Sequence, residues 1–201
     1  MKKTFRRAFI EITNECNLAC GFCASSSRPK SAMSLETFER AAAQAGNIAA
    51  VIFPHLLGEP FMHPRFPEVL AACSRLGLKL NLVTNGLLLD KFGPDIFSEK
   101  CLGQVSVSLH TLSGLPAVLR AQSLLRFVEF ARHRPPGLIV SFRLRGNPGD
   151  AFIKETKTFL LGALAEDGAG ERVRDGLKLR HGVYLNFGGI FDWPGGPGGR
   201  A

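Results

Sequence analysis

The chain has 201 residues, of which 45% are hydrophobic and 21% are charged. This composition is that of an ordinary globular protein, long enough for one sizeable core and short for two. The formal net charge is +8, which can attract nucleic acid, phosphates or an acidic peptide, but no basic run is interleaved with aromatic residues, so a solvated surface is the simpler interpretation. The basic N-terminus lacks the apolar segment of a signal peptide, and no stretch approaches the roughly 18 apolar residues of a membrane helix. We therefore expect a cytoplasmic protein with no membrane partner.

Short runs rich in β-branched, Leu and Phe residues alternate with longer stretches of helical spacing. The expected strands are 9–13, 50–53, 78–84, 105–109, 138–144 and 183–187. Ser34 suits the N-cap of the first helix, and further helices are expected at 64–76, 116–132 and 151–165. This alternation predicts an α/β fold with a parallel sheet. A closed eight-stranded barrel usually needs about 250 residues, so we expect a partial (β/α)6 TIM-like barrel.

The end of the chain differs in composition from the rest. Residues 1–193 are interpreted as one core domain. Residues 194–201 are rich in Gly and Pro, a composition that cannot bury a core, and they are expected to form a disordered tail.

Three of the five cysteines lie within the eight residues CNLACGFC, from Cys16 to Cys23. They follow the first expected strand, and in parallel α/β folds that loop lies at the C-terminal edge of the sheet, where active sites gather. Thiolates are soft ligands for iron–sulfur clusters, zinc or copper(I). Structural zinc usually takes two separated pairs of ligands. No second pair is present, because the two remaining cysteines, Cys73 and Cys101, are interpreted as small buried hydrophobic residues. An odd cysteine count also fits a reduced compartment.

The C-x3-C-x2-C spacing, with the aromatic Phe22 before the last cysteine, resembles the signature of the radical S-adenosylmethionine (radical SAM) family. The resemblance implies that Cys16, Cys20 and Cys23 ligate a [4Fe-4S] cluster. The open iron would bind the amino and carboxylate groups of S-adenosylmethionine (SAM), and Phe22 is counted among the cofactor-binding residues.

The segment Leu57-Gly58-Glu59-Pro60 follows the second expected strand. It is similar to the family's Gly-Gly-Glu motif, with Leu57 in place of the first glycine. The amino group of SAM needs acceptors, which a carboxylate and backbone carbonyls can supply, and glycine permits close backbone approach. Gly58 and Glu59 are therefore expected to bind the cofactor.

Three more polar residues are expected near the cofactor at the ends of later strands. Asn85 belongs to a Thr-Asn-Gly turn that borders the cofactor pocket in the family. Alternation along the fourth strand places Ser108 on one face with Ser106 and His110. Arg143 on the fifth strand would hold the carboxylate or ribose of SAM, or equally pair with a protein carboxylate.

Three histidines have no assigned role. His55 and His63 flank the Gly-Glu segment, and a hydrogen-bonded structural histidine is the simpler interpretation of either. His110 stands where family members often have Asp.

The resemblance implies an oxidoreductase that reductively cleaves SAM to a 5′-deoxyadenosyl radical, which abstracts a substrate hydrogen. The branch it resembles includes molybdenum-cofactor, pyrroloquinoline-quinone and sulfatase-maturation enzymes. A reductant such as flavodoxin or ferredoxin is implied, with an unidentified peptide or small-molecule substrate.

The alternative is a catalytically incomplete iron–sulfur or SAM-binding protein that acts with a partner. Relatives commonly continue into a cysteine-rich extension, which this sequence lacks. The strand at 183–187 would then be an uncovered barrel edge, which invites self-association or a partner protein.

Overall fold

The structure is a computed structural model that describes residues 3–24 and 27–190. The Gly/Pro-rich segment 194–201 lies outside the described residues. The chain divides into two compact units. The first comprises the chain up to Asn17, Arg28–Ser106 and Pro135–Ile139, and the second comprises the remaining described residues.

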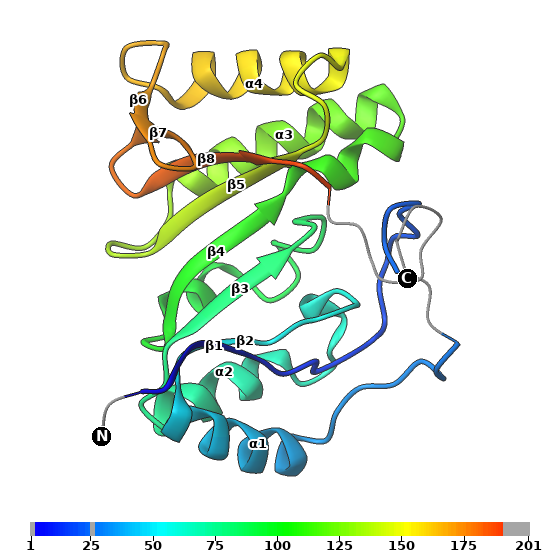
Figure 1. Ribbon diagram of the computed structural model, residues 1–201, viewed down its shortest axis with the longest axis vertical. Helices are drawn as coiled ribbons and strands as arrows, with labels where there is room; N and C mark the ends of the chain where they lie inside the picture. Colours follow the sequence, from blue (N-terminus) through cyan, green and yellow to red (C-terminus); the bar gives the residue numbers. More distant parts are fainter. Residues whose placement is uncertain (1–2, 25–26, 191–201) are drawn as a thin grey trace. The chain divides into compact units, whose positions relative to one another are not determined.

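The first unit is a parallel sheet with two helices. Its strands lie in the order β1 (Phe5–Phe9), β2 (Ala49–Phe53), β3 (Leu80–Thr84) and β4 (Leu102–Ser108). The pairings of β1 with β2 and of β2 with β3 are parallel. Helices α1 (Leu35–Ile48) and α2 (Phe66–Arg75) lie side by side (Figure 1). Short 3-10 helices occupy Pro60–Met62 (η1) and Pro94–Ser98 (η2).

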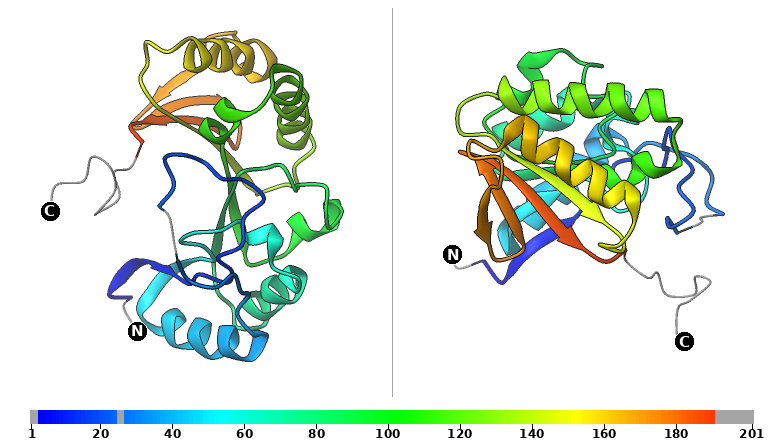
Figure 2. Two further views of the ribbon diagram at one scale, coloured as in Figure 1. Left: turned by 90° about the vertical axis from the view of Figure 1, so that its right-hand side faces the viewer. Right: turned by 90° about the horizontal axis from the view of Figure 1, so that it is seen from above.

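The second unit starts at the end of β4 and combines parallel and antiparallel pairing. From there the strand order is β5 (Ile139–Arg145), β8 (Val183–Gly188), β7 (Gly176–Arg180) and β6 (Glu171–Val173). The β5–β8 pairing is parallel, and β8, β7 and β6 pair antiparallel. Helices α3 (Ala117–Arg132) and α4 (Ala151–Leu164) run beside each other (Figure 2), and η3 spans Leu109–Gly114.

The strand order runs from β1 to β6 without closing. The parallel pairs, separated in sequence by helices, confirm the predicted α/β class and partial barrel. Within the described residues, no helix is both long and apolar enough to cross a membrane.

The prediction of the first strand was wrong in its position. The strand is Phe5–Phe9, whose residues are mostly exposed, so no buried pattern marks it in the sequence. In the residues expected as strand, Ile10, Ile12 and Thr13 are buried, and Thr13 forms one isolated antiparallel bridge with Ala32. Burial of apolar residues therefore occurs here without a strand ladder.

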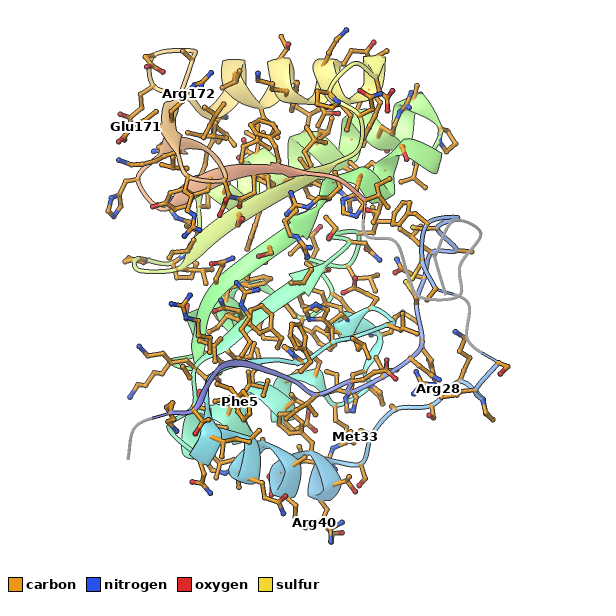
Figure 3. The ribbon with its side chains drawn as sticks, in the orientation of Figure 1. Phe5, Arg28, Met33, Arg40, Glu171 and Arg172 are labelled. Carbon is orange, nitrogen blue, oxygen red and sulfur yellow. The ribbon has the colours of Figure 1, made fainter. Side chains whose placement is uncertain are left out.

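The prediction that 183–187 forms an uncovered barrel edge was also wrong. β8 pairs with β5 on one side and with β7 on the other, and both Val183 and Leu185 are fully buried. The covering hairpin, β6 and β7, was missed because its sequence is charged and contains glycines. In the second unit the outermost strand is β6, which carries Glu171 and Arg172 (Figure 3).

The cap of α1 gives a test of the local structure. Ser34 Oγ accepts a hydrogen bond from the backbone N–H of Thr37 at 3.2 Å, as the sequence predicts for an N-cap. Ser34→Ala should lower the free energy of unfolding by about 1 kcal/mol, measured by urea denaturation. Ser34→Asp, which retains an acceptor, should stay close to the wild type, and equal losses in both variants would contradict the cap.

Candidate functional site

The segments on either side of the cysteine-bearing loop are tied together by hydrogen bonds. Thr13 Oγ1 donates to the carbonyl of Ser31 at 3.0 Å. The Asn14 side chain donates to the carbonyl of Pro29 at 2.8 Å and accepts from the backbone N–H of Ser31 at 2.8 Å. Figure 3 labels Arg28 and Met33 on the returning segment, and Arg28 forms an ion pair with Glu11 at 2.6 Å. The base of the loop is thus closed by the protein's own groups.

The backbone of the loop after β2 lies directly against the backbone of the segment before Cys16. Gly58 has a φ of +76°, and a Cβ there would lie 2.5 Å from the carbonyl oxygen of Thr13 and 2.8 Å from that of Glu15. The backbone N–H of Glu59 donates to the Glu15 carbonyl at 2.7 Å. Gly58 thus makes a close backbone approach, and the groups that it approaches are the carbonyls of Thr13 and Glu15.

The Glu59 carboxylate is buried, with 1% of the residue exposed. Its Oε1 accepts from Thr84 Oγ1 at 2.7 Å and from the backbone N–H of Phe61 at 3.2 Å. Its Oε2 accepts from the backbone N–H of Asn85 at 2.7 Å. Burial raises the pKa of Glu59 above its ordinary value, while these three hydrogen bonds act in the opposite direction. The carboxylate therefore joins the loop after β2 to the turn after β3.

Asn85 extends this network to the first cysteine. Its Nδ2 donates to Asn17 Oδ1 at 2.8 Å and lies 3.9 Å from Cys16 Sγ. Its Oδ1 accepts from the backbone N–H of Leu87 at 3.0 Å. Within the first unit, the structure thus brings Gly58, Glu59 and Asn85 together with the residues around Cys16.

The second unit holds the other end of the motif. The backbone N–H of Cys23 donates to the carbonyl of Cys20 at 3.0 Å, which forms a turn. The Phe22 ring lies 5.0 Å from the His110 ring between centroids, at an interplanar angle of 51°. His110 Nδ1 lies 3.3 Å from the carbonyl oxygen of Arg143, so it carries the proton in this bond. Burial is the main cause that lowers the pKa of His110 to about 4, and the ring is neutral near pH 7.

The predicted common face of Ser106, Ser108 and His110 does not extend to the histidine. β4 ends at Ser108, and His110 lies in the 3-10 helix η3. Ser108 is buried, and its carbonyl accepts from Thr111 Oγ1 at 2.6 Å. Ser106 Oγ accepts from Gln104 Nε2 at 2.8 Å. The hydroxyl of Ser106 thus has a partner within its own strand, and the backbone of Arg143 anchors His110.

His63 is a structural histidine, as the simpler interpretation of the sequence held. It is 1% exposed, its Nδ1 accepts from the backbone N–H of Arg65 at 3.1 Å, and its Nε2 donates to the carbonyl of Met33 at 2.9 Å. Both ring nitrogens therefore form hydrogen bonds, one to the segment that leads to α1 and one to the residue before α2. His55 forms ring contacts with Phe9 and Phe53.

Sequence reasoning missed Thr13 and Asn14, which close the base of the loop. The signal available was a polar Thr-Asn pair directly after an apolar run and two residues before the first cysteine. Short polar side chains at such a position commonly hydrogen-bond to neighbouring backbone.

The donor set of the motif suits a soft metal centre. Cys16, Cys20 and Cys23 are in the thiol form and are exposed or partly exposed, and the Asn85 amide lies near the first of them. Cys16 belongs to the first unit and the other two to the second. In the part of the chain that the structure describes, no three His, Cys, Asp or Glu side chains are assembled as a metal site. The chemistry of the thiols fits an iron–sulfur cluster, and their role as its ligands stays a prediction.

Residues 10–133, more than half of the chain, match the family described as the Radical SAM superfamily. Among curated proteins, the PqqA peptide cyclase of Rhizobium meliloti (strain 1021) is 31% identical over 107 residues, which are 51% of this chain and 28% of that protein. The probable GTP 3′,8-cyclase of Aeropyrum pernix is 30% identical over 114 residues, which are 52% of this chain and 32% of that protein. The matched region spans about a third or less of these relatives.

Among solved structures, Streptococcus suis SuiB bound to S-adenosylmethionine has a TM-score of 0.65 at 19% identity, covering 98% of this chain and 44% of that one. SuiB bound to its precursor peptide SuiA has a TM-score of 0.60 at 22% identity, covering 80% of this chain and 38% of that one. These likenesses support the partial-barrel fold.

The backbone approach at Gly58 gives a stability test. Gly58→Ala adds a Cβ at a positive φ and against two carbonyl oxygens, whereas Gly77→Ala adds one at a φ of +63° with nothing within 4 Å. Strain at a positive φ costs about 1–2 kcal/mol, so Gly77→Ala should lose that amount of unfolding free energy and Gly58→Ala clearly more. Equal losses in urea denaturation would show that the close approach is not maintained.

The partly buried His110 predicts a pH dependence of stability. Its pKa in the folded chain is about 4, below the ordinary 6.5, so the unfolded chain binds the proton more tightly. The stabilisation is present above pH 6.5 and is lost as the pH falls toward 4. Across this range the wild type should lose more unfolding free energy than His110→Phe. The exposed His133→Phe should follow the wild type, and parallel curves for wild type and His110→Phe would contradict the burial.

Proposed function

Because the chain belongs to the radical SAM superfamily, we propose that it is an enzyme that reductively cleaves SAM at a [4Fe-4S] cluster. The observation that carries the proposal is the network from Glu59 through Asn85 to Cys16, which joins the family's two motifs in one unit. When bound, such a cluster supplies the electron that cleaves the sulfonium to a 5′-deoxyadenosyl radical, which abstracts a hydrogen from the substrate.

In this proposal the cluster ligands are Cys16, Cys20 and Cys23. The side-chain amide of Asn85, 3.9 Å from Cys16 Sγ, is a hydrogen-bond donor to that sulfur, and hydrogen bonds to sulfur are among the factors that set the potential of such centres. Phe22 packs on His110 and so restrains the turn that carries Cys20 and Cys23.

Gly58 and Glu59 act on the cofactor mainly by fixing the backbone of the loop after β2. The carboxylate of Glu59 accepts three hydrogen bonds from the protein, so the carbonyls of its own loop are the acceptors for the amino group of SAM. The negative charge of the carboxylate favours that ammonium electrostatically. In this proposal the side chains of Ser108, the last residue of β4, and of Arg143 on β5 contact the ribose or carboxylate of SAM.

The proposal includes a reductant such as flavodoxin or ferredoxin. The names of the relatives, a peptide cyclase and a GTP cyclase, support a peptide or a small molecule as the substrate.

The cluster assignment is tested by anaerobic reconstitution. The wild type should bind about four irons per chain, with broad visible absorption that is lost in air. Cys16→Ala, Cys20→Ala and Cys23→Ala should each lose the cluster, because no fourth thiol of the loop can replace the missing ligand. Cys73→Ala, which removes a buried thiol elsewhere, should retain it. A Cys20→Ala variant with wild-type iron content would refute the assignment.

The role of Glu59 is tested on the reconstituted protein by SAM binding and by formation of 5′-deoxyadenosine with dithionite. Glu59→Gln removes the charge that attracts the ammonium of SAM, and it should weaken SAM binding severalfold with little change in iron content. Glu68→Gln, at an exposed carboxylate on α2, should bind SAM like the wild type. An intact cluster without SAM cleavage would favour the alternative, an incomplete protein that needs a partner.

A further inference from the structure

Two cysteines outside the candidate site lie against each other inside the first unit. Cys73 is on α2, and Cys101 directly precedes β4. Both are free thiols, with exposed fractions of 0% and 3%. The proposed function assigns no chemistry to either of them.

The backbone and side-chain contacts place Cys101 on the face of α2 that carries Cys73. Cys101 Sγ lies 3.4 Å from the carbonyl oxygen of Leu70, which is three residues before Cys73 on the helix. The backbone N–H of Cys101 donates to Ser74 Oγ, one residue after Cys73, at 3.3 Å. Cys101 therefore contacts α2 on both sides of Cys73.

The connection from α2 to β3 fixes both cysteine backbones. The N–H of Leu78 donates to the carbonyl of Cys73 at 3.0 Å, and the N–H of Leu80 donates to the carbonyl of Cys101 at 2.7 Å. Since Leu78 and Leu80 are two residues apart, the two cysteines are held close together by backbone hydrogen bonds that do not depend on either thiol.

Each of the two thiols affects the ionisation of the other. The interaction with Cys101, and then burial, raise the pKa of Cys73, while the interaction with Cys73 lowers the pKa of Cys101. In the folded chain the Cys101 thiol donates to the carbonyl of Leu70. A sulfur that is oxidised to a sulfenic acid beside a second thiol condenses with it to a disulfide.

We propose that Cys73 and Cys101 are an oxidisable dithiol that closes to a disulfide between α2 and the start of β4 on reaction with hydrogen peroxide. Cys101 loses its proton and its sulfur attacks one peroxide oxygen, which breaks the O–O bond and gives a sulfenic acid, while the released hydroxide takes up that proton as water. The Cys73 sulfur then attacks the sulfenic sulfur, the S–O bond breaks, and the thiol proton leaves with the oxygen as water. In sum, two thiols and one peroxide give one disulfide and two waters.

The test uses the full chain without a cluster, so its outcome is independent of the SAM reaction. Iodoacetamide first alkylates the accessible Cys16, Cys20 and Cys23 in the folded protein. Hydrogen peroxide is then added, the chain is unfolded, and N-ethylmaleimide labels every thiol that remains. Trypsin places each buried cysteine in its own peptide, Phe66–Arg75 and 101–120.

After peroxide, these two peptides should appear as one linked species, lighter by two hydrogens than their sum, and their maleimide adducts should disappear. Dithiothreitol should restore both adducts. In Cys101→Ala, Cys73 should not enter a linked species. Full maleimide labelling of both cysteines after peroxide, or oxidation to sulfinic acids without linkage, would overturn the proposal, and this wild-type readout stands even if the variant does not fold.

Discussion

The arrangement of the first unit depends on one backbone contact, between Gly58 and the carbonyls of Thr13 and Glu15. A Cβ at position 58 would lie 2.5 Å from the Thr13 carbonyl oxygen, so the loop after β2 and the segment before Cys16 can pack this closely only with glycine there. The adjacent hydrogen bond from Glu59 to Glu15 fixes their register. Since the Glu59 carboxylate also holds the turn after β3, a single dipeptide positions three separate stretches of chain around the first cysteine.

Much of the fold follows from local signals, and the exceptions share a cause. Ser34 caps α1 and Thr84 ends β3 where the sequence predicts, because capping and turn chemistry act over a few residues. The first strand was misplaced because an exposed edge strand has no buried pattern. The β6–β7 hairpin was missed for a similar reason, since its charged sequence pairs through backbone bonds that no hydrophobic alternation reveals.

The candidate site was predictable where the chemistry resides in a motif. The three cysteines and the Gly-Glu pair are recognisable by spacing alone. The three hydrogen bonds to the Glu59 carboxylate were not predictable, because a glutamate is usually exposed. Two of the three donors, Thr84 and Asn85, lie 25 and 26 residues later in the chain. His110 was assigned to a strand face because no local signal marks the change from β4 to a 3-10 helix. The contact between Cys73 and Cys101 is likewise a tertiary feature.

The closed base of the cysteine-bearing loop bears on how such a loop can change in evolution. Thr13 and Asn14 join the incoming chain to residues 29–32, so the ends of the loop are fixed whatever lies between them. The entropy of closing a loop grows only slowly with its length, and residues inserted between fixed ends disturb little of the surrounding sheet. The sequence between these fixed ends can therefore change in evolution with little effect on the rest of the first unit.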